Sequence, residues 1–267
     1  MAFETIGVDS LLLVAVLVAT VGFFYSNLGL GGGQLYVPIM DLFFVSLVMK
    51  EIVPLSLCFA FATMASATYS HSRKGLVDFR LGLMLAAGGL FGVVGGVLFT
   101  SSVDERFVKV GFAVLLLIVG TKMVLDLYKA RKDSAPAWTN PSTKRMFAGI
   151  GVSVLTGFLI GSFGIGGGVV SVPLIIYVFR FETRRAIGTS AFVGAILTPA
   201  AFAAYAFREG VTIHYDLALT LTPIILVVAI IGSTWGLKKL KTRAVRTIFV
   251  GGVFLAACEM VYSLLTQ

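Results

Sequence analysis

Charged residues are scarce in this chain. Only 13% of its 267 residues are Asp, Glu, Lys or Arg, whereas 58% are hydrophobic. A soluble protein of this length needs more polar residues than that to cover its surface, so the composition excludes an ordinary soluble domain. The balance predicts instead an all-helical protein that crosses a lipid bilayer several times.

Cysteine and histidine are also rare, with two of each. Cys58 and Cys258 both lie inside apolar runs, and their spacing indicates neither a disulfide framework nor a metal site. His71 and His214 each stand alone, so we expect no metal ion and no cofactor. No nucleophile elbow, phosphate-binding loop or zinc-binding spacing occurs, and we therefore do not expect an enzyme.

The net charge of +8 comes from basic residues in short turns between the apolar runs, not from one polar face. A nucleic-acid partner is therefore not expected. Lys and Arg in short loops are retained on the cytoplasmic side of membrane proteins, so we interpret these residues as determinants of orientation.

Glycine, by contrast, is abundant and is concentrated in two similar stretches. Residues 29–38 read GLGGGQLYVP, and residues 164–173 read GIGGGVVSVP. In each case an apolar run ends at the glycines and a shorter apolar segment follows. The two stretches begin 135 residues apart, at positions 29 and 164, and Glu51–Ser56 pairs with Arg185–Ser190 at nearly the same offset. This self-similarity predicts a duplicated chain.

The duplication divides the chain into a first transmembrane repeat (1–132), a linker (133–142) and a second repeat (143–267). The short segment 34–48 would be about 22 Å long as a helix, less than the roughly 30 Å of a hydrocarbon core, and the sequence leaves open whether it spans or re-enters. The expected apolar segments are five in each repeat: 10–28, 34–48, 52–70, 81–100 and 107–127, then 146–163, a short one to 179, 186–206, 217–236 and a last one ending near 263.

The loop charges predict one orientation. The basic loops near positions 73–80, 129–145, 180–185 and 238–246 can all be placed in the cytoplasm, which leaves the acidic turns and both chain termini outside. Because each repeat has an odd number of segments, the two repeats would then lie upside down relative to each other in the membrane. We therefore expect an inverted repeat with a helix break at a glycine-rich loop in each half.

The glycine loops are the candidate site. Irregular backbone at membrane depth is tolerated where it lines a polar cavity or is buried in protein. A helix that begins directly after such a loop presents free N–H groups and a positive dipole end, which favour an anion. Loops that enter from opposite sides can meet near the bilayer midplane and form one shared site. The alternative is that the glycines only allow a tight turn and close packing.

Neutral polar residues near the loops complete the candidate site, since they would hold an anion without binding it too strongly to release it. Asp41 has Ile176 as its counterpart and could be a proton-coupling carboxylate, or it could be an interfacial residue. The candidate substrate-binding residues are Asn27, Gly31, Gly32, Gly33, Gln34, Ser56, Gly166, Gly167, Gly168, Ser171, Thr189 and Ser190.

Together with the glycine stretches, two further motifs carry a family resemblance: Ala186–Ser190 (AIGTS) and Gly75–Arg80 (GLVDFR). In their order, duplication and spacing, they resemble the TauE/SafE sulfite exporter family. This resemblance implies a multi-pass carrier in the bacterial inner membrane for small sulfur-containing or organic anions, such as sulfite, sulfoacetate or other organosulfonates. The first repeat departs from the family pattern at Pro54–Ser56, where Gly-Thr-Ser is usual, and at Asp41.

The expected function is therefore a secondary transporter, an exporter of a small anion that works by alternating access around the two glycine loops. Its expected partners are the anion and the lipid bilayer, and the sequence leaves open a homo-oligomer. One alternative is an anion channel in which the glycine loops form the filter, and another is a membrane protein without transport activity.

Overall fold

The computed structural model describes residues 8–128, 143–239 and 242–266, and within these ranges the chain is helical without strands. The all-helical membrane fold is thus confirmed, whereas the linker 133–142 lies outside the described residues. The helices are α1 (Val8–Leu28), α2 (Gly33–Phe43), α3 (Met49–Ser72), α4 (Phe79–Ser102), α5 (Glu105–Tyr128), α6 (Thr143–Phe163), α7 (Gly168–Val178), α8 (Thr183–Ala206), α9 (Tyr215–Lys239) and α10 (Thr242–Thr266).

Long apolar helices alternate with two short ones. Helices α2 and α7 have 11 residues each, about 16 Å of helix, so neither can cross a bilayer alone. The sequence-based bounds 34–48 were too long for α2, because Phe44 leaves the helical conformation and the chain turns before α3 begins. Six helices of the described chain are long and apolar enough to span a membrane: 10–28, 49–72, 79–102, 146–163, 183–206 and 215–235.

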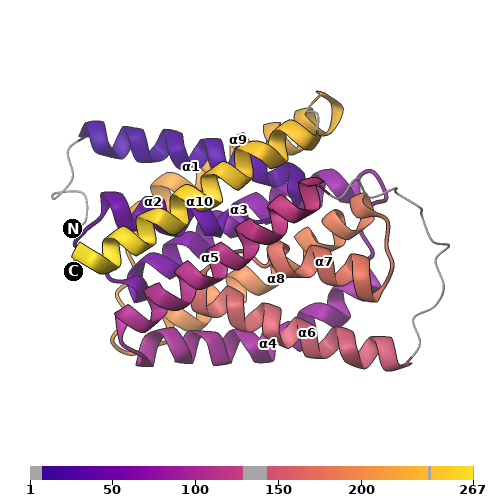
Figure 1. The fold of residues 1–267 in the computed structure, drawn as a ribbon, viewed down its shortest axis with the longest axis horizontal. Helices are drawn as coiled ribbons and strands as arrows, with labels where there is room; N and C mark the ends of the chain where they lie inside the picture. The colour runs from indigo at the N-terminus through magenta and orange to yellow at the C-terminus, as the bar shows by residue number, and fades with distance from the viewer. Residues whose placement is uncertain (1–7, 129–142, 240–241, 267) are drawn as a thin grey trace.

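The helices pack in reciprocal pairs. Helix α4 lies against α6, and the corresponding helices of the other repeat, α9 and α1, also lie against each other. The contact of α3 with α9 likewise has its counterpart in the contact of α8 with α4. Two pairs of equivalent helices also contact each other, α3 with α8 and α5 with α10. Figure 1 shows α1 with α9 along one edge and α4 with α6 along the opposite edge, with α3, α5 and α8 between them. The two repeats are thus intertwined rather than side by side.

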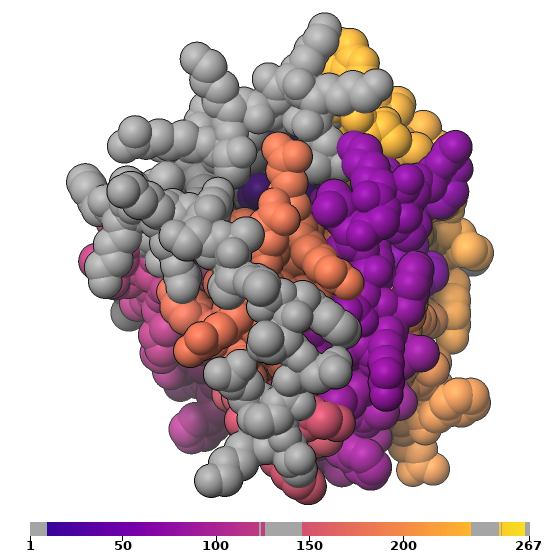
Figure 2. Space-filling view, turned by 90° about the vertical axis from the view of Figure 1, so that its right-hand side faces the viewer, coloured from indigo at the N-terminus to yellow at the C-terminus, as the bar shows by residue number. Residues whose placement is uncertain are grey.

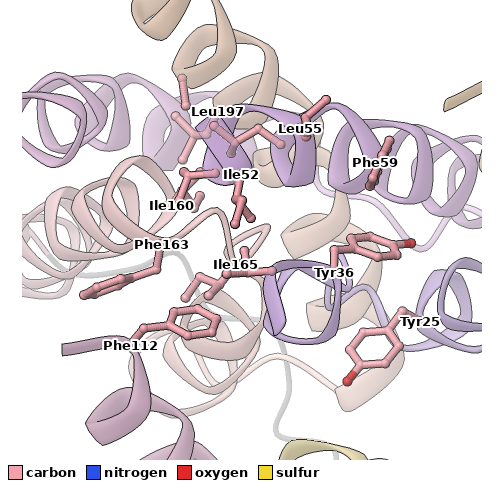
Figure 3. Packing of buried hydrophobic residues seen from close by; sticks show 14 of the residues in the cluster. Tyr25, Tyr36, Ile52, Leu55, Phe59, Phe112, Ile160, Phe163, Ile165 and Leu197 are labelled. Carbon is pink, nitrogen blue, oxygen red and sulfur yellow. The ribbon is translucent and has the colours of Figure 1, made fainter. Parts of the chain in front are cut away.

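The core forms where the two repeats meet. Ile165, in the second glycine loop, lies among buried side chains from both halves of the chain, including Tyr36 of α2, Ile52 of α3 and Phe112 of α5 (Figure 3). The glycine loop is therefore enclosed by protein and does not face lipid.

Glycines allow the edge pairs to approach closely. A Cβ atom added at Gly92 of α4 would meet the carbonyl oxygen of Val154 on α6, and one added at Gly157 of α6 would meet that of Gly89. On the other edge, a Cβ at Gly232 of α9 would meet the carbonyl oxygen of Phe23. Such backbone contact is how helices associate in lipid, where burial of apolar side chains gives little advantage. The glycine-rich segment 81–100 therefore serves packing.

We expect Gly157→Val to lower the stability of the protein by about 1–3 kcal/mol, because the new side chain overlaps the α4 backbone. The matched control is Gly151→Val on the same helix, where an added Cβ meets nothing within 4 Å. The thermal unfolding midpoint of each detergent-purified variant checks this. Equal midpoints for the two variants would contradict the packing described for α4 and α6.

Candidate functional site

The two glycine loops lie in direct contact. A Cβ atom built on Gly31 would be 2.7 Å from the Cα of Gly166, and one built on Gly166 would be 2.7 Å from the Cα of Gly31. A Cβ on Gly33 would meet the carbonyl of Gly164, and one on Gly168 would meet the carbonyl of Gly29. The loops therefore pack backbone against backbone, and the contact is reciprocal between the repeats.

Glycine is required where each short helix starts. Gly32 precedes α2 with φ 87°, and Gly167 precedes α7 with φ 81°, in the left-handed region that other residues rarely adopt. This conformation turns the chain sharply from the end of α1 or α6 into the next helix. The first N–H groups of α2 and α7 have no acceptor within their own helix, and they lie beside the loop contact.

The space beside the glycines is occupied in this conformation. A Cβ on Gly32 would lie 2.8 Å from the ring of Tyr36, and one on Gly167 would lie 2.5 Å from Ile160. Close packing therefore accounts for the glycines, which agrees with the alternative considered for them. An anion that binds here needs a conformation in which the loops separate, or it is held by the polar side chains around them.

Several of those polar side chains lack hydrogen-bond partners. Within the described residues, both amide atoms of Gln34, the Asn27 Oδ1 and the Ser190 Oγ are buried without a partner, although the Tyr25 hydroxyl lies close to Gln34. Gln34 is 1% exposed and Ser190 is fully buried. A buried polar group left unpaired costs about 1–3 kcal/mol, so these groups favour occupation by a ligand or water that can bond to them.

Other candidate residues bond to the protein itself. The Ser56 hydroxyl donates to the carbonyl oxygen of Val53 at 2.9 Å and shares this proton with the carbonyl oxygen of Gly164 at 3.3 Å, so it lies where α3 packs against the second loop. Thr189 accepts a hydrogen bond from the backbone N–H of Asp78 at 3.0 Å, and it therefore helps to fix the start of α4. Ser171 is buried in the first turn of α7, directly after the second loop.

Two equivalent contacts between acidic and basic side chains join the repeats. Arg185, the third residue of α8, lies 3.3 Å from Asp78, which directly precedes α4. Glu51, the third residue of α3, lies 3.7 Å from His214, which directly precedes α9. The two pairs thus occupy corresponding positions with the signs of charge exchanged. The turns that carry Asp78 and Arg185 lie next to each other on the face shown in Figure 2.

A third charged cluster lies at the end of α2. Asp41 Oδ1 is 3.0 Å from Lys109 Nζ of α5, and Lys109 also contacts Glu105 at 3.3 Å and donates to Ser263 at 3.0 Å. The residue pattern indicates Asp41 but not Lys109, which is 1% exposed, because Lys109 stands near the start of its apolar run. The only sequence signal was the four-residue spacing of Glu105 and Lys109.

Comparison with known proteins agrees with this architecture. A family model described as sulfite exporter TauE/SafE matches residues 13–260. The probable membrane transporter protein YunE of Bacillus subtilis is 26% identical over 94% of this chain and 96% of its own length. MJ0441 of Methanocaldococcus jannaschii, also named a probable membrane transporter protein, is 26% identical over 83% of each chain.

A further relative from Xylella fastidiosa, again named a probable membrane transporter protein, is 31% identical over 64% of each chain. No solved structure matches the chain. The family match covers most of both repeats, including both glycine loops and the helices that pack around them. The chain therefore belongs to the sulfite exporter TauE/SafE family of membrane proteins.

Proposed function

We propose that this protein is a secondary transporter that exports a small anion, such as sulfite, sulfoacetate or another organosulfonate, by alternating access around the two glycine loops. The observation that carries the proposal is the set of buried, unpaired polar groups next to two helix N-termini that meet inside the protein. The description of its family, sulfite exporter, supports a small sulfur-containing anion as the substrate.

The chemistry of the loops suits an anion that binds briefly. The N-terminal ends of α2 and α7 supply N–H donors and positive dipole ends, and Gln34 adds an amide donor. Asn27, Ser171 and Ser190 add further neutral groups around them. Neutral donors hold an anion less tightly than an Arg or Lys side chain would, which favours release on the far side of the membrane.

A carrier fits the contact between the loops better than a channel does. The backbones of the two loops touch, so a path between them opens only when the repeats move. Alternating access also needs one contact that closes the protein toward each side of the membrane. The Asp78–Arg185 and Glu51–His214 pairs supply two such contacts, and in an inverted repeat they would lie toward opposite membrane faces.

We expect Gln34→Leu to weaken anion binding about 10- to 100-fold, which corresponds to losing a hydrogen bond to a charged group. Since the Tyr25 hydroxyl lies close to Gln34, the free energy of unfolding without ligand should fall by no more than about 0.5–1.5 kcal/mol, the contribution of one hydrogen bond. Thermal-shift titrations with sulfite, thiosulfate, sulfonates and carboxylates measure both effects. The control is Val169→Leu, at the equivalent position after the second loop. Equal ligand-induced shifts in wild type and Gln34→Leu would contradict the assigned site.

Proteoliposomes distinguish the two modes of transport. We expect uptake of labelled anion to saturate and to be accelerated by unlabelled anion on the opposite side, because a carrier exposes its site to one side at a time. Flux that rises without saturation and passes as a steady electrical current would instead identify a channel.

The proposed inverted topology predicts on which side of the membrane the C-terminus lies. A reporter that is active only outside the cytoplasm should give a signal when it is fused after Gln267. A reporter that is active only in the cytoplasm should give a signal when it is inserted in the linker after Pro136. The two fusions control for each other's expression. Cytoplasmic signal from the Gln267 fusion would overturn the orientation.

A further inference from the structure

We propose that Asp41, Lys109 and Glu259 form a proton-binding site whose occupancy is coupled to movement of the anion. This inference rests on the proposed transport function and adds a second ligand, the proton. The three residues come from α2, α5 and α10, and α10 packs against both α2 and α5 (Figure 1).

The cluster is buried and unusual for a membrane protein. The side chains of Lys109 and Asp41 are 1% and 3% exposed, and their charged atoms are 3.0 Å apart. Glu259 of α10 interacts electrostatically with both of them. Ionisable groups at such positions are costly and are retained where they have a function, commonly in proton relays.

The charges in this cluster do not balance. Three carboxylates, those of Asp41, Glu105 and Glu259, act on the single ammonium group of Lys109. If all are ionised, the cluster carries two excess negative charges in a region of low dielectric. One bound proton removes part of this repulsion.

The hydrogen bonding also leaves room for a proton. Within the described residues, Asp41 Oδ2 and Glu259 Oε2 are buried without a hydrogen-bond partner. A carboxylate can only accept, whereas a protonated carboxyl group can donate. A proton on either oxygen would therefore supply the missing donor.

Other titratable groups lie on the elements that pack around the cluster. Glu51 lies beside His214, and Met49 N–H donates to Glu105. Segment 146–163 of α6 contains no titratable residue. The remaining titratable side chains on the elements packed near α2 include Tyr25 on α1, Tyr36 on α2, Lys50 on α3, Arg106 on α5 and Tyr262 on α10.

The cluster is connected to the proposed anion site through α2. Asp41 follows Gln34 by seven residues, two helical turns or about 10 Å along the same short helix. Any movement of α2 that separates the glycine loops also displaces Asp41 from Lys109. Protonation of Asp41 weakens its ion pair with Lys109 and so favours that movement, and release of the proton restores the pair.

The site has no symmetry-related counterpart among the described residues. Ile176 occupies the position equivalent to Asp41, so α7 cannot form the same ion pair. Helix α10 packs against α2, which brings Glu259 and Ser263 toward the cluster. A single proton site therefore serves both halves, and we expect one coupled proton for each transport cycle.

Two measurements test the proposal, and the first does not depend on the transported anion. The melting temperature of the purified wild type should rise relative to that of Asp41→Asn/Glu259→Gln as the pH is lowered from about 8 to about 5, because a proton bound in the folded state stabilises it. Glu209→Gln, at an exposed turn, should follow the wild type at every pH. A pH-independent difference between wild type and the double variant would overturn the proton site.

The second measurement uses proteoliposomes that contain a pH-sensitive dye, with the membrane potential clamped. In the wild type, a sulfoacetate gradient should change the internal pH, and Asp41→Asn should reduce this change at least about tenfold while anion exchange continues. Anion exchange in the wild type without any pH change would refute coupling and leave the proposed transport intact. If sulfoacetate is not exchanged and no anion shifts the melting temperature, the transport proposal is refuted. The pH dependence of the melting temperature then still decides whether the proton site exists.

Discussion

Backbone-to-backbone contact between the two glycine loops is the constraint on which the rest of this structure depends. Gly31 and Gly166 approach so closely that neither can carry a side chain, and each loop reverses the chain into a helix of only 11 residues. The long helices must then arrange themselves around the paired loops. The reciprocal contacts of α4 with α6 and of α9 with α1 enclose that centre from both edges.

Because apolar helices enclose the glycine loops, the polar side chains near the loops are informative about what can bind there. In a bilayer, water cannot compensate an unpaired amide or charge, so each such group either finds a protein partner or marks a place where something else binds. Ser56 and Thr189 have partners in the backbone and hold elements in position. The Ser190 hydroxyl is buried without a partner among the described residues, and Gln34, which directly follows the first glycine loop, has the Tyr25 hydroxyl close to it.

Residue pattern predicted the helical membrane fold, the duplication and the break at each glycine loop, because apolar run length and glycine clusters are local properties. It overestimated α2 by five residues, since the end at Phe43 is set by how the chain turns into α3. It could not show that Thr189, a predicted anion ligand, also accepts a hydrogen bond from the backbone N–H of Asp78, 111 residues away. Lys109 was missed because it stands near the start of its apolar run and because its partner, Asp41, lies on another helix.

The sequence by itself determined that the chain is a duplicated membrane protein with two glycine breaks, since composition and repetition need no knowledge of which helices touch. Only the tertiary structure decided that the two loops contact each other, that Asp41 pairs with Lys109, and that Glu51 and Arg185 make equivalent contacts, with His214 and Asp78 respectively. These contacts join residues far apart in the chain. Their geometry arises from close packing of all the helices at once, which no local pattern encodes.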